Sequence, residues 1–159
     1  MDQTEEHSRR GFPPTAGFFL GLGLGGFFDG IIFHQVLQWH QMLTSAGYPA
    51  DNVRNLQINT LWDGLFHLTT YIFVAVALFL LWRTAQQHVH WSGKLLVGTT
   101  LMGFGIFNGV EGLVAHHLLG IHHVNETVPP EQDLLGYQVS ALGRSDARWR
   151  LAFIQSWEI

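Results

Sequence analysis

Three long apolar stretches dominate this chain of 159 residues. They cover about residues 15–42, 58–82 and 95–119, and polar connections separate them. The second stretch contains YIFVAVALFLLW, which has no charged residue. A helix of about 20 residues crosses the roughly 30 Å hydrocarbon core of a bilayer, so each stretch is long enough to span it. The sequence therefore predicts an all-α membrane protein, folded as a three-helix transmembrane bundle.

The composition agrees with a membrane protein and excludes several other classes. Hydrophobic residues make up 47% of the chain and charged residues only 13%, which is low for a soluble domain. Without cysteine there is no disulfide, iron–sulfur cluster or thiolate metal site. The net charge is -4 and no basic stripe occurs, so we expect no nucleic-acid partner. The expected partners are the lipid bilayer and further copies of this chain, because three helices make a thin bundle.

The two ends of the chain differ from the apolar middle. Residues 1–14 are polar and end in two prolines, which predicts a disordered N-terminal arm. Residues 15–128 form the predicted transmembrane domain. Residues 129–159 form an atypical tail, because its apolar segment 134–143 is about half the length that a span needs. We expect this tail to be interfacial or disordered.

The basic residues predict an orientation in the membrane. Arg9 and Arg10 precede the first apolar stretch, and Arg83 and Lys94 lie in the second connection. The first connection carries only Arg54. Because basic residues concentrate on the cytoplasmic side, we expect a cytoplasmic N-terminus in the plasma (inner) membrane. The first connection would then face outward.

Each apolar stretch carries one carboxylate with histidines close behind it. A charge in hydrocarbon is costly and is rarely there without a function. Imidazole and carboxylate together are also ligands that divalent transition metals favour. The candidate metal ligands are Asp29, His34, His40, Asp63, His67, Glu111, His116, His117, His122 and His123. In the predicted orientation the three acids lie at a similar depth, toward the outer face.

Regular helical spacing limits which of these residues can meet. Asp63 and His67 are four residues apart and share one face of a helix. Asp29 and His40 share a face of the first helix, whereas His34 lies on another face. One regular helix therefore cannot direct all its candidates at one ion. Either there are two sites, or some acids orient histidines that bind the metal.

Glycines spaced four residues apart are typical of helices that pack closely in lipid. Gly17, Gly21 and Gly25 have this spacing in the first stretch, and Gly105 and Gly109 have it in the third. We therefore expect these glycines to lie at helix–helix contacts.

These observations favour a buried histidine/carboxylate site for copper, iron or zinc near the outer face, with a role in metal handling or redox chemistry. Four alternatives remain open. They are a di-metal oxidase or hydroxylase, a haem protein with His34 and His67 as axial ligands, a metal-free proton relay, and a scaffold protein. Whether the protein is an enzyme does not follow from the sequence.

Three motifs together resemble a bacterial family of small multi-pass membrane proteins of unknown function. They are GGFFDGIIFHQVLQWHQM, DGLFH and FNGVEGLVAHHLLGIHHV, and the resemblance covers about residues 15–128. It implies that the candidate ligands, together with Gln38 and Asn108, are family positions. It also implies a fourth spanning helix in most members, and a link to terminal-oxidase assembly or copper.

Overall fold

The computed structural model describes residues 13–87, 91–119 and 123–128. Its secondary structure over these residues is entirely helical, which confirms the predicted fold class. The elements are α2 (Pro14–Phe28), the π-helix η1 (Asp29–Val36), α3 (Val53–Gln86), α4 (Gly93–Glu111) and the π-helix η2 (Gly112–Leu118). Most of the predicted N-terminal arm and all of the predicted tail, residues 129–159, lie outside the described residues.

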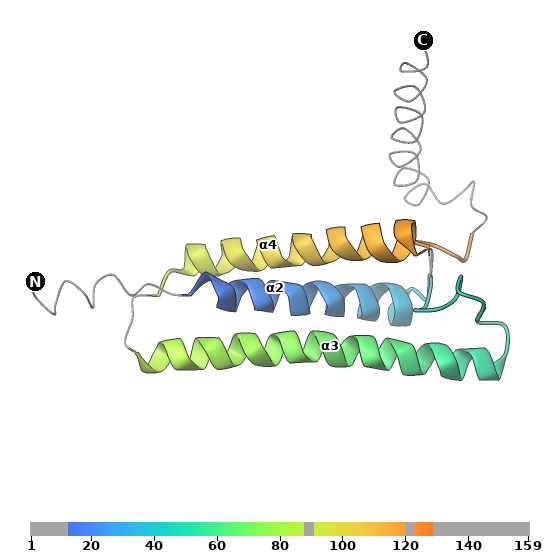
Figure 1. The fold of residues 1–159 in the computed structure, drawn as a ribbon, viewed down its shortest axis with the longest axis horizontal. Coiled ribbons are helices and arrows are strands. Elements are labelled where there is room, and N and C mark those ends of the chain that lie inside the picture. Colours follow the sequence, from blue (N-terminus) through green and yellow to red (C-terminus); the bar gives the residue numbers. More distant parts are fainter. Residues whose placement is uncertain (1–12, 88–90, 120–122, 129–159) are drawn as a thin grey trace, which may run out of the picture.

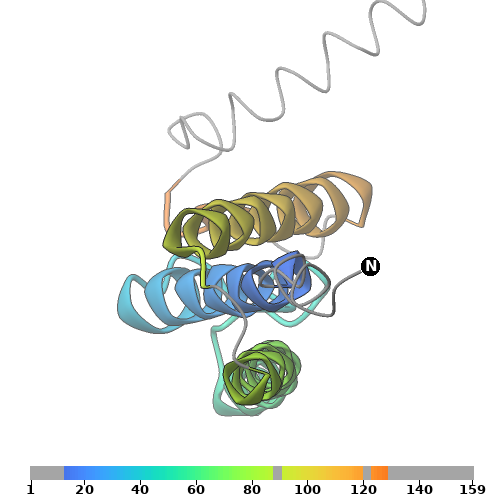
Figure 2. The same cartoon turned by 90° about the vertical axis from the view of Figure 1, so that its left-hand side faces the viewer.

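Three helices of the described part are long and apolar enough to cross a membrane. They cover Pro14–Val36, Val53–Gln86 and Gly93–Ala115. The middle layer is α2, with α4 on one side and α3 on the other, and both views agree on this order (Figures 1 and 2). In the most apolar 18-residue segment of the first span, 44% of the residues are buried. The corresponding share is only 11% in each of the other two spans. The first span is therefore the core of the bundle, and the other described residues leave most of α3 and α4 uncovered.

Glycine allows the backbones of α2 and α4 to contact each other directly. A Cβ at Gly21 would collide with the carbonyl oxygen of Thr100 and lie 2.9 Å from the Cα of Gly103. The glycine contacts predicted for the first stretch are thus confirmed. For Gly105 and Gly109 the described residues show no such contact, because no atom of another described helix lies within 4 Å of where their Cβ would be. Those two glycines lie on a face of α4 that no described helix covers.

Two π-helices end the first and third spans on the same side of the bundle (Figure 1). In η1 the backbone N–H of Leu37 donates to the carbonyl of Ile32 at 2.8 Å. In η2 the N–H of Leu119 donates to the carbonyl of Val114 at 2.9 Å. Each bond joins residues five apart instead of four, so the turns are wider than in an α-helix. Such turns are frequent at functional sites.

The first span ends at Val36, before the end of the apolar stretch near residue 42. Gln38 has φ +52°, a left-handed conformation that is uncommon outside glycine and reverses the chain here. The chain is then fastened to α3, because the N–H of Leu43 donates to Asn59 Oδ1 at 2.9 Å. Asn59 is fully buried and also donates to the carbonyl of Tyr48 at 2.8 Å. This fold-back brings residues 39–43 over the end of η1.

Candidate metal centre

Three predicted ligands meet where η1 gives way to the turn. Asp29, His34 and His40 are 5%, 2% and 3% exposed, and one ligand atom from each lies within 4.8 Å of the others. All three come from a single stretch of twelve positions, 29–40, at the end of the first span. A buried group of two imidazoles and one carboxylate of this kind could hold a metal ion.

The π-helix brings Asp29 and His34 together. These residues are five apart, so in an α-helix their side chains would diverge by about 140°. In η1 Oδ2 of Asp29 lies 3.4 Å from Nε2 of His34. Regular spacing placed the two residues on different faces, and that part of the prediction is wrong because η1 is wider than an α-helix.

His40 reaches the group from the turn. Its Nδ1 lies 2.8 Å from the carbonyl oxygen of Val124, so Nδ1 carries the hydrogen and donates it. The rings of His34 and His40 are 4.7 Å apart between centroids and nearly perpendicular. The contact with Val124 fixes the tautomer of His40, which would then bind a metal through Nε2.

Asp63 orients His34 from the opposite side. Its Oδ1 lies 3.0 Å from His34 Nδ1 and accepts the N–H of Met42, also at 3.0 Å. His34 therefore lies between two buried carboxylates, with Asp29 at Nε2 and Asp63 at Nδ1. A carboxylate at the outer nitrogen is the usual partner of a metal-binding histidine, because it fixes the ring and raises its basicity.

His67 and Glu111 lie near the group but outside it. The His67 ring stacks on Phe27 with centroids 6.0 Å apart, and its Nε2 is buried against Gly30 without a hydrogen bond to the described residues. Glu111, at the end of α4, lines an apolar groove.

The remaining candidates are all on the segment after α4. His123 is exposed, and its ring contacts Ser45 at 3.0 Å and Glu126 at 3.7 Å. His122 and the side chains of His116 and His117 lie outside the described part of the chain.

Residues 123–128 cover the turn that carries His40. The N–H of Glu126 donates to the carbonyl of Trp39 at 2.8 Å, and its carboxylate accepts a hydrogen bond from Ser45. Sequence reasoning missed these contacts and the one made by Val124. Every residue has a peptide carbonyl, so no residue type marks the acceptors at Trp39 and Val124.

Comparison with known protein families matches residues 16–144 to the family described as "Predicted membrane protein (DUF2243)". The chain belongs to this family. The match extends beyond the predicted limit near residue 128 and includes residues 129–144 of the tail. No curated protein and no solved structure matches the chain.

Membership establishes a membrane protein, which agrees with the three apolar helices, and makes contact with lipid plausible. The family description supplies no reaction. The buried Asp/His/His group at one end of the bundle could hold a metal ion.

Proposed function

We propose that this protein is a plasma-membrane protein that binds one divalent transition metal ion through Asp29, His34 and His40. The ion would lie near the outer face and serve metal handling or redox chemistry. Asp63 and His67 are then neighbours of the site, and Glu111 and the histidines after it are neighbours or further ligands. His67 and Glu111 would not belong to the group of Asp29, His34 and His40.

The observation that carries this proposal is the orientation of the two histidines. His34 directs Nδ1 to Asp63 and His40 directs Nδ1 to Val124, so both would coordinate through Nε2. A hydrogen-bonded outer nitrogen on each ring is characteristic of histidines that bind metal. A histidine that only joined two helices would not need a second carboxylate at its other nitrogen, as His34 has in Asp29.

The donor set favours particular ions. Two imidazoles and one carboxylate with open positions are the ligands of many non-haem iron(II) sites, and zinc and copper(II) also accept them. The chain has no cysteine and only three methionines, which disfavours a copper(I) site. We expect iron(II) first, with zinc next.

The charge distribution supports the orientation. Arg83 lies in the last turn of α3 and Lys94 in the first turn of α4, at the end of the bundle opposite η1 and η2 (Figure 1). Arg54, in the first turn of α3, is the basic residue near the opposite end. The positive-inside rule then assigns the end with Arg83 and Lys94 to the cytoplasm and the metal centre to the outer side.

A metal-free proton relay is the second candidate. Asp29, His34 and Asp63 form a continuous chain of polar contacts through both nitrogens of one imidazole. Intramembrane chains of acids and histidines carry protons in pumps and transporters. Metal content separates the two functions.

The test is elemental analysis of the detergent-purified protein after repletion with iron, zinc and copper. We expect about one ion per chain, loss of the ion in His34→Gln and in His40→Gln, and retention in His67→Gln, where the control is a half-buried histidine outside the group. Circular dichroism would show that each variant remains helical. Absence of metal from the wild type would shift the assignment to the proton relay. A haem absorption band would also contradict the proposal.

A further inference from the structure

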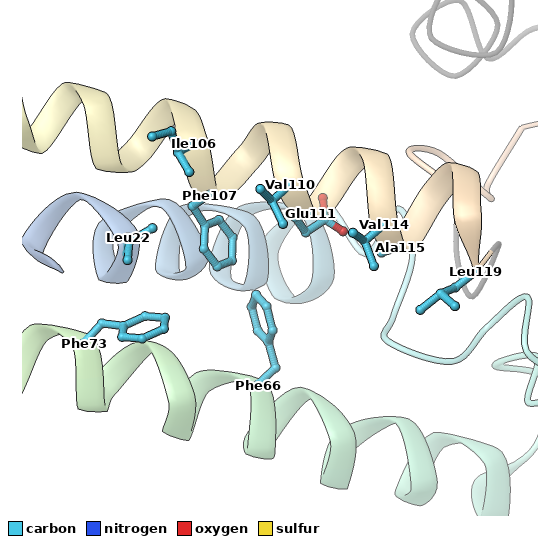
Figure 3. Close-up of a pocket in the computed structure, with 10 residues that line it drawn as sticks. All are labelled: Leu22, Phe66, Phe73, Ile106, Phe107, Val110, Glu111, Val114, Ala115 and Leu119. Atoms are coloured by element: carbon cyan, nitrogen blue, oxygen red, sulfur yellow. The ribbon is translucent and has the colours of Figure 1, made fainter. Parts of the chain in front are cut away.

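The two histidines of the candidate metal centre are held in different ways. His34 is held inside the bundle, because Asp63 contacts its Nδ1 at 3.0 Å and the ring of Phe66 lies 5.9 Å away between centroids. Both partners belong to α3, where Phe66 also lines an apolar groove between α3 and α4 (Figure 3). His40 instead has a hydrogen-bond partner beyond the third span, the carbonyl oxygen of Val124. The position of this second histidine therefore depends on the segment that carries Val124.

Packing alone does not orient the ring of His40. The ring stacks on Phe33 of η1, with centroids 6.2 Å apart and an interplanar angle of 26°. Such a contact holds the plane of the ring but does not choose which nitrogen carries the hydrogen. The bond to Val124 makes that choice, because it keeps the hydrogen on Nδ1 and leaves Nε2 for a metal. Val124 belongs to residues 123–128, which we call the strap.

Glu126 fastens the strap to the rest of the bundle. Its N–H donates to the carbonyl of Trp39 at 2.8 Å. Its Oε1 accepts a hydrogen bond from the hydroxyl of Ser45, and another from the N–H of His123 at 3.0 Å. Because His123 precedes Val124 and Glu126 follows it, these contacts bend the strap around Val124 and join it to the connection before α3.

The carboxylate of Glu126 is largely withdrawn from water. Its side chain is 21% exposed, whereas that of His123 is 62% exposed. A carboxylate in such a place needs hydrogen-bond donors, and Ser45 and His123 supply them. Since the hydroxyl hydrogen of Ser45 goes to Glu126, its oxygen accepts from Nδ1 of His123 at 3.0 Å. The three residues thus form a closed set of contacts.

We propose that Glu126 is a positioning residue for the metal centre. It holds the strap so that Val124 fixes the tautomer of His40 and directs Nε2 toward the ion. Glu126 acts through the backbone of the strap and is not itself a ligand. This inference rests on the proposed metal site, and it adds a requirement that the ligand set does not contain: the segment after α4 must be fastened before His40 can bind the ion.

The first test is made without metal. NMR of the detergent-solubilised protein with isotope-labelled histidine reports which ring nitrogen carries the hydrogen, and His40→Gln identifies the signals of His40. We expect one tautomer in the wild type, with the hydrogen on Nδ1, and a mixture of both tautomers in Glu126→Ala. Because no ion is present, this result is independent of whether the protein binds one.

The second test measures zinc affinity by competition against a chromophoric chelator. Glu126→Ala should lower the affinity about tenfold, the lower end of the effect of losing an outer partner of a ligand histidine. Glu126→Gln keeps an oxygen acceptor at the same place, so its affinity and His40 tautomer should stay near those of the wild type. Ser45→Ala should change both in the direction of Glu126→Ala. The double variant should be no weaker than Glu126→Ala, because the two side chains share one contact.

Thr127→Val is the matched control within the strap. The Thr127 hydroxyl donates to Oδ1 of Asn125 at 2.6 Å, so the contact that it loses lies inside the strap. Its affinity and His40 tautomer should be those of the wild type. Circular dichroism of every variant would show that the helices persist.

Several outcomes would overturn the proposal. An unchanged tautomer in Glu126→Ala would mean that Val124 is held without Glu126. Equal losses of affinity in Glu126→Gln and Glu126→Ala would mean that negative charge near the site, and not the fastened strap, favours the ion. A similar loss in Thr127→Val would mean general loosening of the strap. A wild type without zinc but with the expected tautomer change would contradict the metal site, while supporting the action of Glu126 on His40.

Discussion

Asp63 is a single buried residue that serves both the fold and the candidate site. The same oxygen, Oδ1, accepts from Met42 in the turn and contacts Nδ1 of His34. Asp63 thereby links the fold-back of the chain to the orientation of His34, a proposed ligand. Its place four residues before His67 suggested a ligand pair from α3, but the contacts give Asp63 an outer role and leave His67 against Gly30.

Asp63→Asn should lower metal affinity by about 10- to 100-fold, the usual effect of losing an outer partner of a ligand histidine. Asparagine keeps an acceptor for Met42, so the turn should persist while the charge at His34 is lost. The measurement is competition against a chromophoric chelator. Asp51→Asn, at an exposed loop carboxylate, is the control and should have wild-type affinity. Unchanged affinity in Asp63→Asn would remove Asp63 from the site.

At the scale of the element, the sequence predicted where helices cross the membrane but not how they are wound. Hydropathy identifies the three spans, because each apolar run must cover a fixed thickness. The cost of charge in lipid likewise marked Asp29 and His34 as candidates. Their meeting could not be predicted, because it depends on the π winding of η1 and on the left-handed Gln38, which have no simple residue signature.

The α2–α4 contact depends on Gly103, and Gly105 on the same helix is the natural comparison. A Cβ at Gly103 would collide with the carbonyl of Phe18 and lie 3.1 Å from the Cα of Gly21. We expect Gly103→Ala to lower the free energy of unfolding by about 1–3 kcal/mol, as overpacking does.

Gly105→Ala should instead be neutral or stabilising by up to about 1 kcal/mol, because alanine is the better helix former and no described neighbouring helix fills the space there. Denaturant unfolding in detergent micelles would measure both variants. Equal effects at the two positions would mean that α4 does not pack on α2 through this glycine.

For the molecule as a whole, the orientation in the membrane decides which compartment the candidate metal centre faces. The chain lacks cysteine, so single cysteines can report accessibility without background. We expect Ala50→Cys, in the exposed connection before α3, to react with a membrane-impermeant maleimide in intact cells. Gln87→Cys, exposed after α3, should react only after permeabilisation. The reverse pattern would put the centre on the cytoplasmic side.

The central position of α2 has a consequence for the order of assembly. Of the three described spans, the first to leave the ribosome is the one on which the other two pack, and α3 and α4 make few contacts with each other. Each later helix can therefore dock on a finished surface as soon as it is inserted, without waiting for the next. Asp29, His34 and Asp63 would already be in contact once α3 has docked, and the segment after α4 would close over His40 last.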